Sequence, residues 1–270
     1  MLGIHMKKKL PVSAKYQLYE SSVQAHEADI EFIHKEYKKI FKCAPLILRE
    51  DFGGTAIMAC EWVAKSPKHQ AYSIDLDLEP INYGIENHWS KLTPSQQKRM
   101  HYVHGNVLSS YSFKPDVIVA FNFSYFIFKK REELLSYFKK VRKSLGKKGA
   151  FFLDIFGGTE CHQILEEKTK FKGHTYFWDC RSFNPINNEC LYYIHFKTHK
   201  DGIKYEKVFT YDWRHWGLAE VREILLDAGF SKTLVFWEGD GDNGEGNGEF
   251  RAKEKEENCQ SWISYIMALP

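Results

Sequence analysis

The chain has 270 residues, of which 43% are hydrophobic and 16% aromatic, and a formal net charge of +3. This length and composition can bury a sizeable core in one domain, or in one domain that carries a large insertion. No stretch approaches the ~20 apolar residues that cross a bilayer, and no apolar run at the N-terminus indicates a secretory signal, so we expect a cytoplasmic protein without membrane contacts. The small net charge predicts no polyanionic partner, and six scattered cysteines without a C-x-x-C pair predict no metal site.

Strands and helices alternate along most of the chain. Helical spacing of apolar residues predicts one or two leading helices over residues 16–41, after a flexible N-terminus over residues 1–15. The alternation that follows predicts an α/β fold, a doubly wound, mainly parallel seven-stranded sheet with helices on both faces, in a single domain over residues 16–270. The predicted strands are residues 45–48, 71–74, 100–103, 116–121, 150–153, 233–237 and 262–269, and the predicted helices are residues 56–64, a helix opening at 79, 134–145 and 218–228.

The alternation of strands and helices stops after the fifth predicted strand. Residues 174–181, 190–197 and 203–211 read as three β segments joined by short, turn-rich connections. Short connections of this kind predict an antiparallel β-meander inserted after the fifth strand, over residues 171–212. Residues 239–248 are expected to form a loop between the two closing strands.

The turn after the first strand indicates the class of ligand. A dinucleotide site needs three spaced glycines, whereas here Phe52 and Ala56 flank Gly53 and Gly54, and two carboxylates, Glu50 and Asp51, precede the turn. Two carboxylates would repel a pyrophosphate and attract a ligand that carries an ammonium and a sulfonium but no phosphate. S-adenosylmethionine (SAM) is such a ligand, so the turn predicts SAM as the cofactor.

In this turn and in the strand ends that follow it, the sequence resembles the class I SAM-dependent methyltransferases, from about Leu46 to the C-terminus. The resemblance implies that Glu50 acts on the methionine amino group, that Asp75 grips the ribose hydroxyls with Asp77 as the alternative, and that Leu76 packs on adenine. It also implies that the turn of Asn106 and Val107 contacts adenine, that Asn122 lines the SAM pocket, and that a leading helix with Tyr19 closes over SAM. The full set of cofactor-binding candidates is Tyr19, Glu50, Phe52, Gly53, Gly54, Asp75, Leu76, Asn106, Val107 and Asn122.

The acceptor pocket is expected to involve the meander, which resembles the acceptor-covering insertion of small-molecule methyltransferases. The substrate-binding candidates are Tyr125, Trp178 and Arg214. His195, Tyr211 and Arg214 are candidate catalytic residues, because His195 could accept a proton near neutral pH and Arg214 could clamp an acidic acceptor. For each of them, packing in an aromatic core is the alternative.

The sequence therefore predicts transfer of a methyl group to nitrogen or oxygen of a small-molecule acceptor by a monomer or homodimer. Three alternatives remain open: methylation of RNA or protein, suggested by the basic run over residues 129–148; SAM binding without catalysis; and an NAD-dependent oxidoreductase.

Overall fold

The computed structural model describes residues 9–241 and 246–270. The chain divides into two compact units. The α/β unit comprises Ala25–Thr159 and Trp216–Pro270, and the meander unit comprises Glu160–His215 together with the described N-terminal residues up to Gln24. The single domain expected over residues 16–270 stays a prediction.

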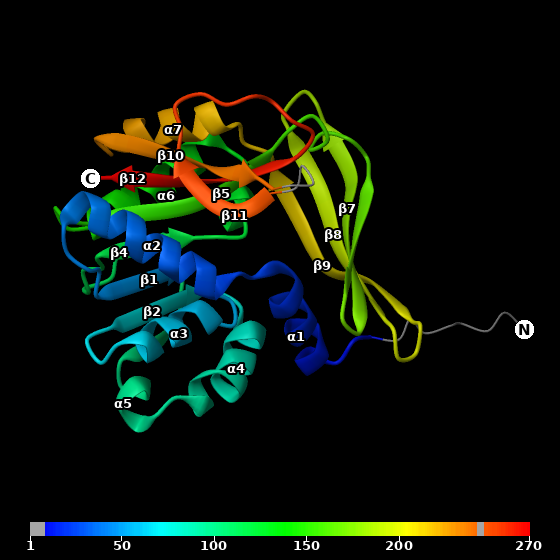
Figure 1. The fold of residues 1–270 in the computed structure, drawn as a ribbon, viewed down its shortest axis with the longest axis horizontal. Coiled ribbons are helices and arrows are strands. Elements are labelled where there is room, and N and C mark those ends of the chain that lie inside the picture. The colour runs from blue at the N-terminus through cyan, green and yellow to red at the C-terminus, as the bar shows by residue number, and fades with distance from the viewer. Residues whose placement is uncertain (1–8, 242–245) are drawn as a thin grey trace, which may run out of the picture. The chain divides into compact units, whose positions relative to one another are not determined.

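The α/β unit is built on one sheet in the order β11-β10-β12-β5-β4-β1-β2-β3. The strands β1 to β5 are parallel to one another, and β12, β10 and β11 continue the sheet in antiparallel pairing. The mainly parallel α/β fold is thereby confirmed, and Figure 1 shows its strands side by side. The strands are β1 Ile47–Asp51, β2 Gln70–Asp75, β3 Met100–His104, β4 Val117–Ala120, β5 Ala150–Gly157, β10 Lys232–Asp240, β11 Gly246–Ala252 and β12 Trp262–Leu269.

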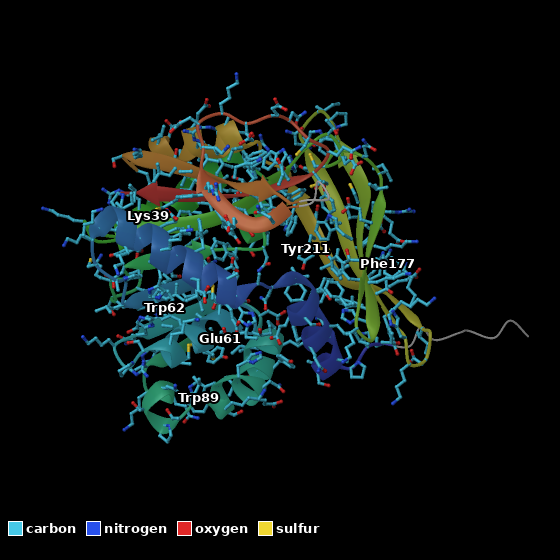
Figure 2. All side chains as sticks on the ribbon, in the orientation of Figure 1. Lys39, Glu61, Trp62, Trp89, Phe177 and Tyr211 are labelled. Carbon is cyan, nitrogen blue, oxygen red and sulfur yellow. The ribbon has the colours of Figure 1, made fainter. Side chains whose placement is uncertain are left out.

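Helices cover both faces of this sheet. One apolar core joins α2 and α3 to the strands through Ile33, Trp62, Leu48 and Phe152, and Figure 2 shows Trp62, whose indole N–H donates to the carbonyl of Leu46 at 3.1 Å. On the other face, Phe138 of α6 packs edge to face on Phe151 of β5. The helices of this unit are α2 His26–Phe41, α3 Ile57–Lys65, α4 Leu78–Asn87, α5 Pro94–Gln97, α6 Arg131–Ser144 and α7 Leu218–Asp227, with 3-10 turns η1 Trp89–Lys91 and η2 Ser124–Ile127.

The predicted number of seven strands is wrong, because the described sheet has eight. The additional strand is β11, which pairs with β10; it begins inside the segment expected to be a loop and continues to Ala252, where no element was predicted. Its sequence, GNGEFRA, has no alternation of apolar residues, and six of its seven residues are exposed. A solvent-exposed edge strand needs no apolar face, so hydrophobic periodicity cannot reveal it. Residues 242–245 of that segment lie outside the described residues.

The meander unit holds a four-stranded antiparallel sheet in the order β6-β7-β8-β9. The three predicted β segments correspond to β7 His174–Asn184, β8 Glu189–Thr198 and β9 Lys204–Arg214, and Figure 2 labels Phe177 on β7 and Tyr211 on β9. The fourth strand, β6 Glu166–Phe171, was not predicted, because its sequence EEKTKF is charged and nearly all exposed. The same unit contains α1 Val12–Val23, which begins inside the segment expected to be flexible. Residues 1–8 of that segment lie outside the described chain.

Among the described helices, none combines the length and the apolar composition that a membrane span requires.

Candidate functional site

The candidate site lies where four neighbouring parallel strands end. β4, β1, β2 and β3 are adjacent and parallel, so their carboxyl ends meet at one edge of the sheet. Ligands of doubly wound sheets bind at this edge. The sequence-predicted residues of the α/β unit that lie there are Glu50, Phe52, Gly53, Gly54, Asp75, Leu76, Asn106, Val107 and Asn122.

The turn after β1 has an unusual backbone. Phe52, Gly54 and Ala56 all have positive φ, at 56°, 54° and 56°, and positive φ is unfavourable for residues with a side chain. Gly53 has no room for a side chain, because a Cβ there would lie 1.9 Å from Oγ of Ser73. A Cβ on Gly54 would meet no atom within 4 Å, so the backbone at Gly54 faces open space that a ligand can approach.

Glu50 is the buried carboxyl group of this turn. Its side chain is 8% exposed, and its Oε2 has no hydrogen-bond partner. Burial raises the pKa of Glu50 from 4.5 to about 8, with a smaller increase from the nearby Asp75 and Asp29 carboxylates. A buried carboxyl oxygen without a donor is costly unless a ligand supplies one. A cationic group at this position would satisfy the oxygen and stabilise its charged form.

Asp51 does not belong to the site, which corrects the expectation that two carboxylates face the ligand. Successive residues of a strand point to opposite faces of the sheet, and Asp51 points toward α6. There it accepts from Arg49 Nε at 2.6 Å and from Tyr137 Oη at 2.9 Å. Burial raises the pKa of Asp51, and the Arg49 guanidinium opposes that shift. Arg49 is fully buried and also donates to the carbonyl of Val107 at 3.0 Å, so this pair braces the sheet beneath the site.

Asp75 ends β2 and is held by two backbone donors. Its Oδ2 accepts from the N–H of Gly54 at 2.8 Å, and its Oδ1 accepts from the N–H of Asp77 at 2.8 Å. Each oxygen keeps further acceptor capacity, which a vicinal diol could use. Asp77, the alternative ribose ligand, is instead the N-cap of α4 and accepts from the N–H of Glu79 at 2.9 Å. Leu76 is 63% exposed, so an apolar side chain stands uncovered beside Asp75.

The turn after β3 contains Asn106, whose side-chain amide makes one hydrogen bond within the turn. Oδ1 of Asn106 accepts from the N–H of Leu108 at 2.9 Å, which fixes the side chain against its own turn. Its Nδ2 and a second lone pair on Oδ1 can still contact a ligand. Val107 is buried, and its carbonyl accepts from Arg49, so it shapes the turn through its backbone.

The loop after β4 is organised by a residue that the sequence analysis missed, Asp154 of β5. Asn122 and Phe123 both have positive φ, and their N–H groups donate to the two carboxylate oxygens of Asp154 at 2.7 and 2.9 Å. Burial raises the pKa of Asp154 to about 7, and these two donors oppose the shift. The signal in the sequence was a single acidic residue inside an otherwise apolar strand, AFFLDIFG. Tyr125, expected in the acceptor pocket, is fully buried, and its hydroxyl donates to the carbonyl of Asp154 at 2.9 Å.

The meander unit holds the remaining candidates. His195 is 4% exposed and uses both ring nitrogens: Nδ1 accepts from the N–H of Lys207 at 2.7 Å, and Nε2 donates to Asp179 at 3.1 Å. This arrangement leaves no lone pair for a general base. Burial raises the pKa of Tyr211 well above its ordinary range, so its phenol stays protonated.

Three further candidates lie in the same unit. The Trp178 ring stacks on Tyr192 with centroids 4.7 Å apart, and Tyr19 of α1 packs at 4.7 Å on Phe209. Arg214 is the last residue of β9 and is paired in register with Glu189. The roles expected for these residues in binding cofactor and acceptor stay predictions.

The residues at the edge of the α/β unit fit SAM better than a dinucleotide. The unsatisfied carboxyl oxygen of Glu50 suits an ammonium group, Asp75 suits the ribose diol, and exposed Leu76 suits the face of a purine. A pyrophosphate would have to lie beside the Glu50 carboxyl group. The strand order, the glycine turn after β1 and the acid that ends β2 agree with the resemblance to the class I SAM-dependent methyltransferases.

Comparison with solved structures gives the same fold. An S-adenosylmethionine-dependent methyltransferase from Clostridium acetobutylicum is 16% identical, with a TM-score of 0.68 over 94% of this chain and 97% of that one. An amino pentose methyltransferase from Micromonospora echinaspora, solved with SAM, is 8% identical with a TM-score of 0.65 over 97% and 99%. A sugar N-methyltransferase from Streptoalloteichus is 14% identical with a TM-score of 0.61 over 94% and 92%. No protein-family model matches the sequence, and no curated protein matches it by sequence.

Proposed function

We propose that this protein is a SAM-dependent methyltransferase that methylates a nitrogen or oxygen atom of a small-molecule acceptor. The observation that carries the proposal is the buried Oε2 of Glu50, which lacks a protein donor beside a glycine turn that opens at Gly54. SAM carries an ammonium and a sulfonium group but no phosphate, so it suits this carboxyl group.

The residues of the α/β unit divide the binding of SAM among them. Glu50 holds the methionine amino group, Asp75 holds the ribose hydroxyls, and Leu76 covers one face of the adenine. When bound, SAM supplies a methyl group activated by its sulfonium. The protein's own task is to orient the acceptor in line with that group and to exclude water, and such alignment can supply on the order of 7 to 11 kcal/mol.

No described side chain is assigned as a general base. His195 uses both ring nitrogens, and Tyr211 stays protonated, so neither is suited to take a proton from the acceptor. Arg214 stays a candidate for an acidic group on the acceptor. An amine acceptor that is deprotonated in solution would need no base.

The basic run lies only partly on the side of the candidate site, because Lys129, Lys130 and Arg131 stand at the start of α6, whereas its last lysines lie at the other end of the sheet. The helix α6 starts after the carboxyl end of β4 and returns to the start of β5, so Lys143, Lys147 and Lys148 lie toward the amino ends of the strands. The candidate site lies at the carboxyl ends. The solved structures of similar fold include enzymes named for amino pentose, sugar and glycopeptide methylation, which agrees with a small polar acceptor.

Calorimetric titration with SAM and S-adenosylhomocysteine, with NAD as the competing ligand, tests the cofactor. We expect binding of both adenosyl ligands and none of NAD, and the reverse pattern would refute the proposal. A screen of amines, amino sugars and hydroxylated small molecules with radiolabelled SAM then tests the acceptor class, and labelling of RNA or protein alone would refute the small-molecule assignment. A cytoplasmic location and a monomeric or dimeric state stay predictions from the sequence.

A further inference from the structure

Three metal-ligating side chains meet in the meander unit. Cys161 and His162 lie just before β6, and His215 directly follows β9. Their ligand atoms, the sulfur and one ring nitrogen of each histidine, all lie within 4.8 Å of one another. The sequence predicted no metal site, because it has no C-x-x-C pair and because His215 lies far along the chain from the adjacent Cys161 and His162.

The neighbours of these residues hold the cluster in place. The carbonyl of Cys161 accepts from Tyr192 Oη at 2.9 Å, and the N–H of His215 donates to the carbonyl of Asn188 at 2.9 Å. The His162 ring stacks on Phe183 with centroids 4.5 Å apart, and it meets the His215 ring edge to face at 5.1 Å. Each of the three residues is therefore positioned by a contact of its own.

The ligand set selects a borderline-soft divalent cation. Thiolate and imidazole are the ligands that Zn²⁺ prefers, with Zn–S at about 2.3 Å and Zn–N at about 2.0–2.1 Å. Tetrahedral ligands at these lengths lie roughly 3.3–3.6 Å apart, so small rotations of the side chains suffice. His215 is buried, Cys161 is half-buried, and His162 is exposed, which leaves an entry path for the ion and a fourth position for water.

A second group of potential ligands lies in the same unit. Glu166, Asp179 and His195 also lie within 4.8 Å of one another. However, Nδ1 of His195 accepts from the N–H of Lys207, so Nε2 carries the proton and donates to Asp179. Glu166 is paired with Lys204 at 2.7 Å. These groups form an ion-pair network that presents no imidazole lone pair to a metal.

We propose that Cys161, His162 and His215 bind one Zn²⁺ ion that fastens the two points where the chain enters and leaves the segment Glu160–His215. Such a link closes the whole segment into a loop, and cross-links that close long loops stabilise a fold by restricting the unfolded chain. The proposal is independent of SAM binding.

Cobalt substitution tests the site directly. The full-length protein is treated with a chelator, desalted and titrated with Co²⁺, and we expect one equivalent to produce the sulfur-to-cobalt charge-transfer band and the visible bands of tetrahedral cobalt. Added Zn²⁺ should bleach these bands and raise the melting temperature. Failure of the wild type to develop the sulfur band would overturn the proposal.

Variants identify the ligands. Cys161→Ser should abolish the sulfur band, whereas Cys43→Ser, which changes an exposed cysteine of the α/β unit, should leave it intact. An unchanged band in Cys161→Ser would overturn the assignment. Because His162 is exposed, His162→Ala should fold normally, as circular dichroism can verify, and should weaken cobalt binding at least tenfold. Unchanged affinity in that variant would also count against the site.

Discussion

The protonation of Glu50 makes cofactor binding depend on pH. With a pKa of about 8, this carboxyl group is about one tenth ionised at pH 7 and about one hundredth at pH 6. The amino group of SAM stays protonated below about pH 7.7 and requires the ionised carboxylate. If only the ionised form binds, the apparent affinity should rise about tenfold between pH 6 and pH 7, with release of about one proton per ligand bound.

Calorimetry in buffers of different ionisation enthalpy measures both the affinity and the proton release. Asp29 and Asp154, whose pKa values burial raises to about 6 and about 7, titrate in the same range, so Glu50→Gln is the necessary comparison. Loss of the charged partner should weaken SAM binding about ten- to a hundredfold at pH 7 and remove most of the pH dependence. An affinity of the wild type that does not change with pH, or an equal pH dependence in Glu50→Gln, would refute the reasoning.

The same substitution should affect the ligand-free protein in the opposite direction. The folded protein binds the Glu50 proton more tightly than the unfolded chain, so stability from this group is present at low pH and is lost as pH rises from about 4.5 to about 8. At pH 7 the loss is on the order of 3 kcal/mol. Without ligand, Glu50→Gln should therefore melt higher than the wild type at pH 8, by a margin that shrinks at pH 5. If the difference in melting temperature between Glu50→Gln and the wild type instead grew toward low pH, the predicted direction of this pH dependence would be wrong.

Further predictions concern the neighbouring groups. Asp75→Ala should weaken SAM binding by about a hundredfold or more, since it removes the acceptor proposed for two ribose hydroxyls, whereas Asp77→Ala should cost about 1 kcal/mol of helix capping in urea unfolding and leave affinity nearly unchanged. Asp154→Asn can accept only one of two backbone N–H groups, so we expect a loss of about 1.5–3 kcal/mol in urea unfolding, and a loss near zero would contradict its positioning role. Arg49→Met leaves Asp51 buried without its cation and should cost about 3–5 kcal/mol, measured in the same way.

Elements with a buried face could be predicted from the sequence. The strands β2, β3 and β12 and the helix α7 lie within a few residues of the predicted ranges, because burial imposes a hydrophobic pattern on them. β6 and β11 carry no such pattern, since both are exposed edge strands made largely of charged or small residues. Hydrophobic periodicity therefore cannot identify a strand whose two faces are exposed to solvent.

The sequence predicted which residues gather at the candidate site, but only part of their contacts. Glycines and acids at the ends of strands or directly after them place the candidate residues at one edge of the sheet, because the carboxyl ends of parallel strands meet there. The role of Asp154 depends on a contact between loops and strands distant in sequence, and a single acid in an apolar strand does not reveal its partners. His195 was interpreted from its residue type alone, and only its two hydrogen bonds show that both nitrogens are used.

The two faces of strand β1 have different roles, one in the stability of the fold and one in the proposed binding of SAM. Arg49 and Asp51 face α6 and satisfy each other, whereas Glu50, between them, faces the glycine turn with an unsatisfied oxygen. Burying Glu50 costs the ligand-free protein stability, and a cationic ligand that pairs with the ionised carboxylate would stabilise the folded protein. The buried Arg49–Asp51 pair on the opposite face fixes the strand from which Glu50 projects, so Arg49→Met should disturb SAM binding even though Arg49 lies on the face of the sheet opposite the proposed cofactor site. Unchanged SAM affinity in a folded Arg49→Met variant would separate the two faces of the strand and refute this coupling.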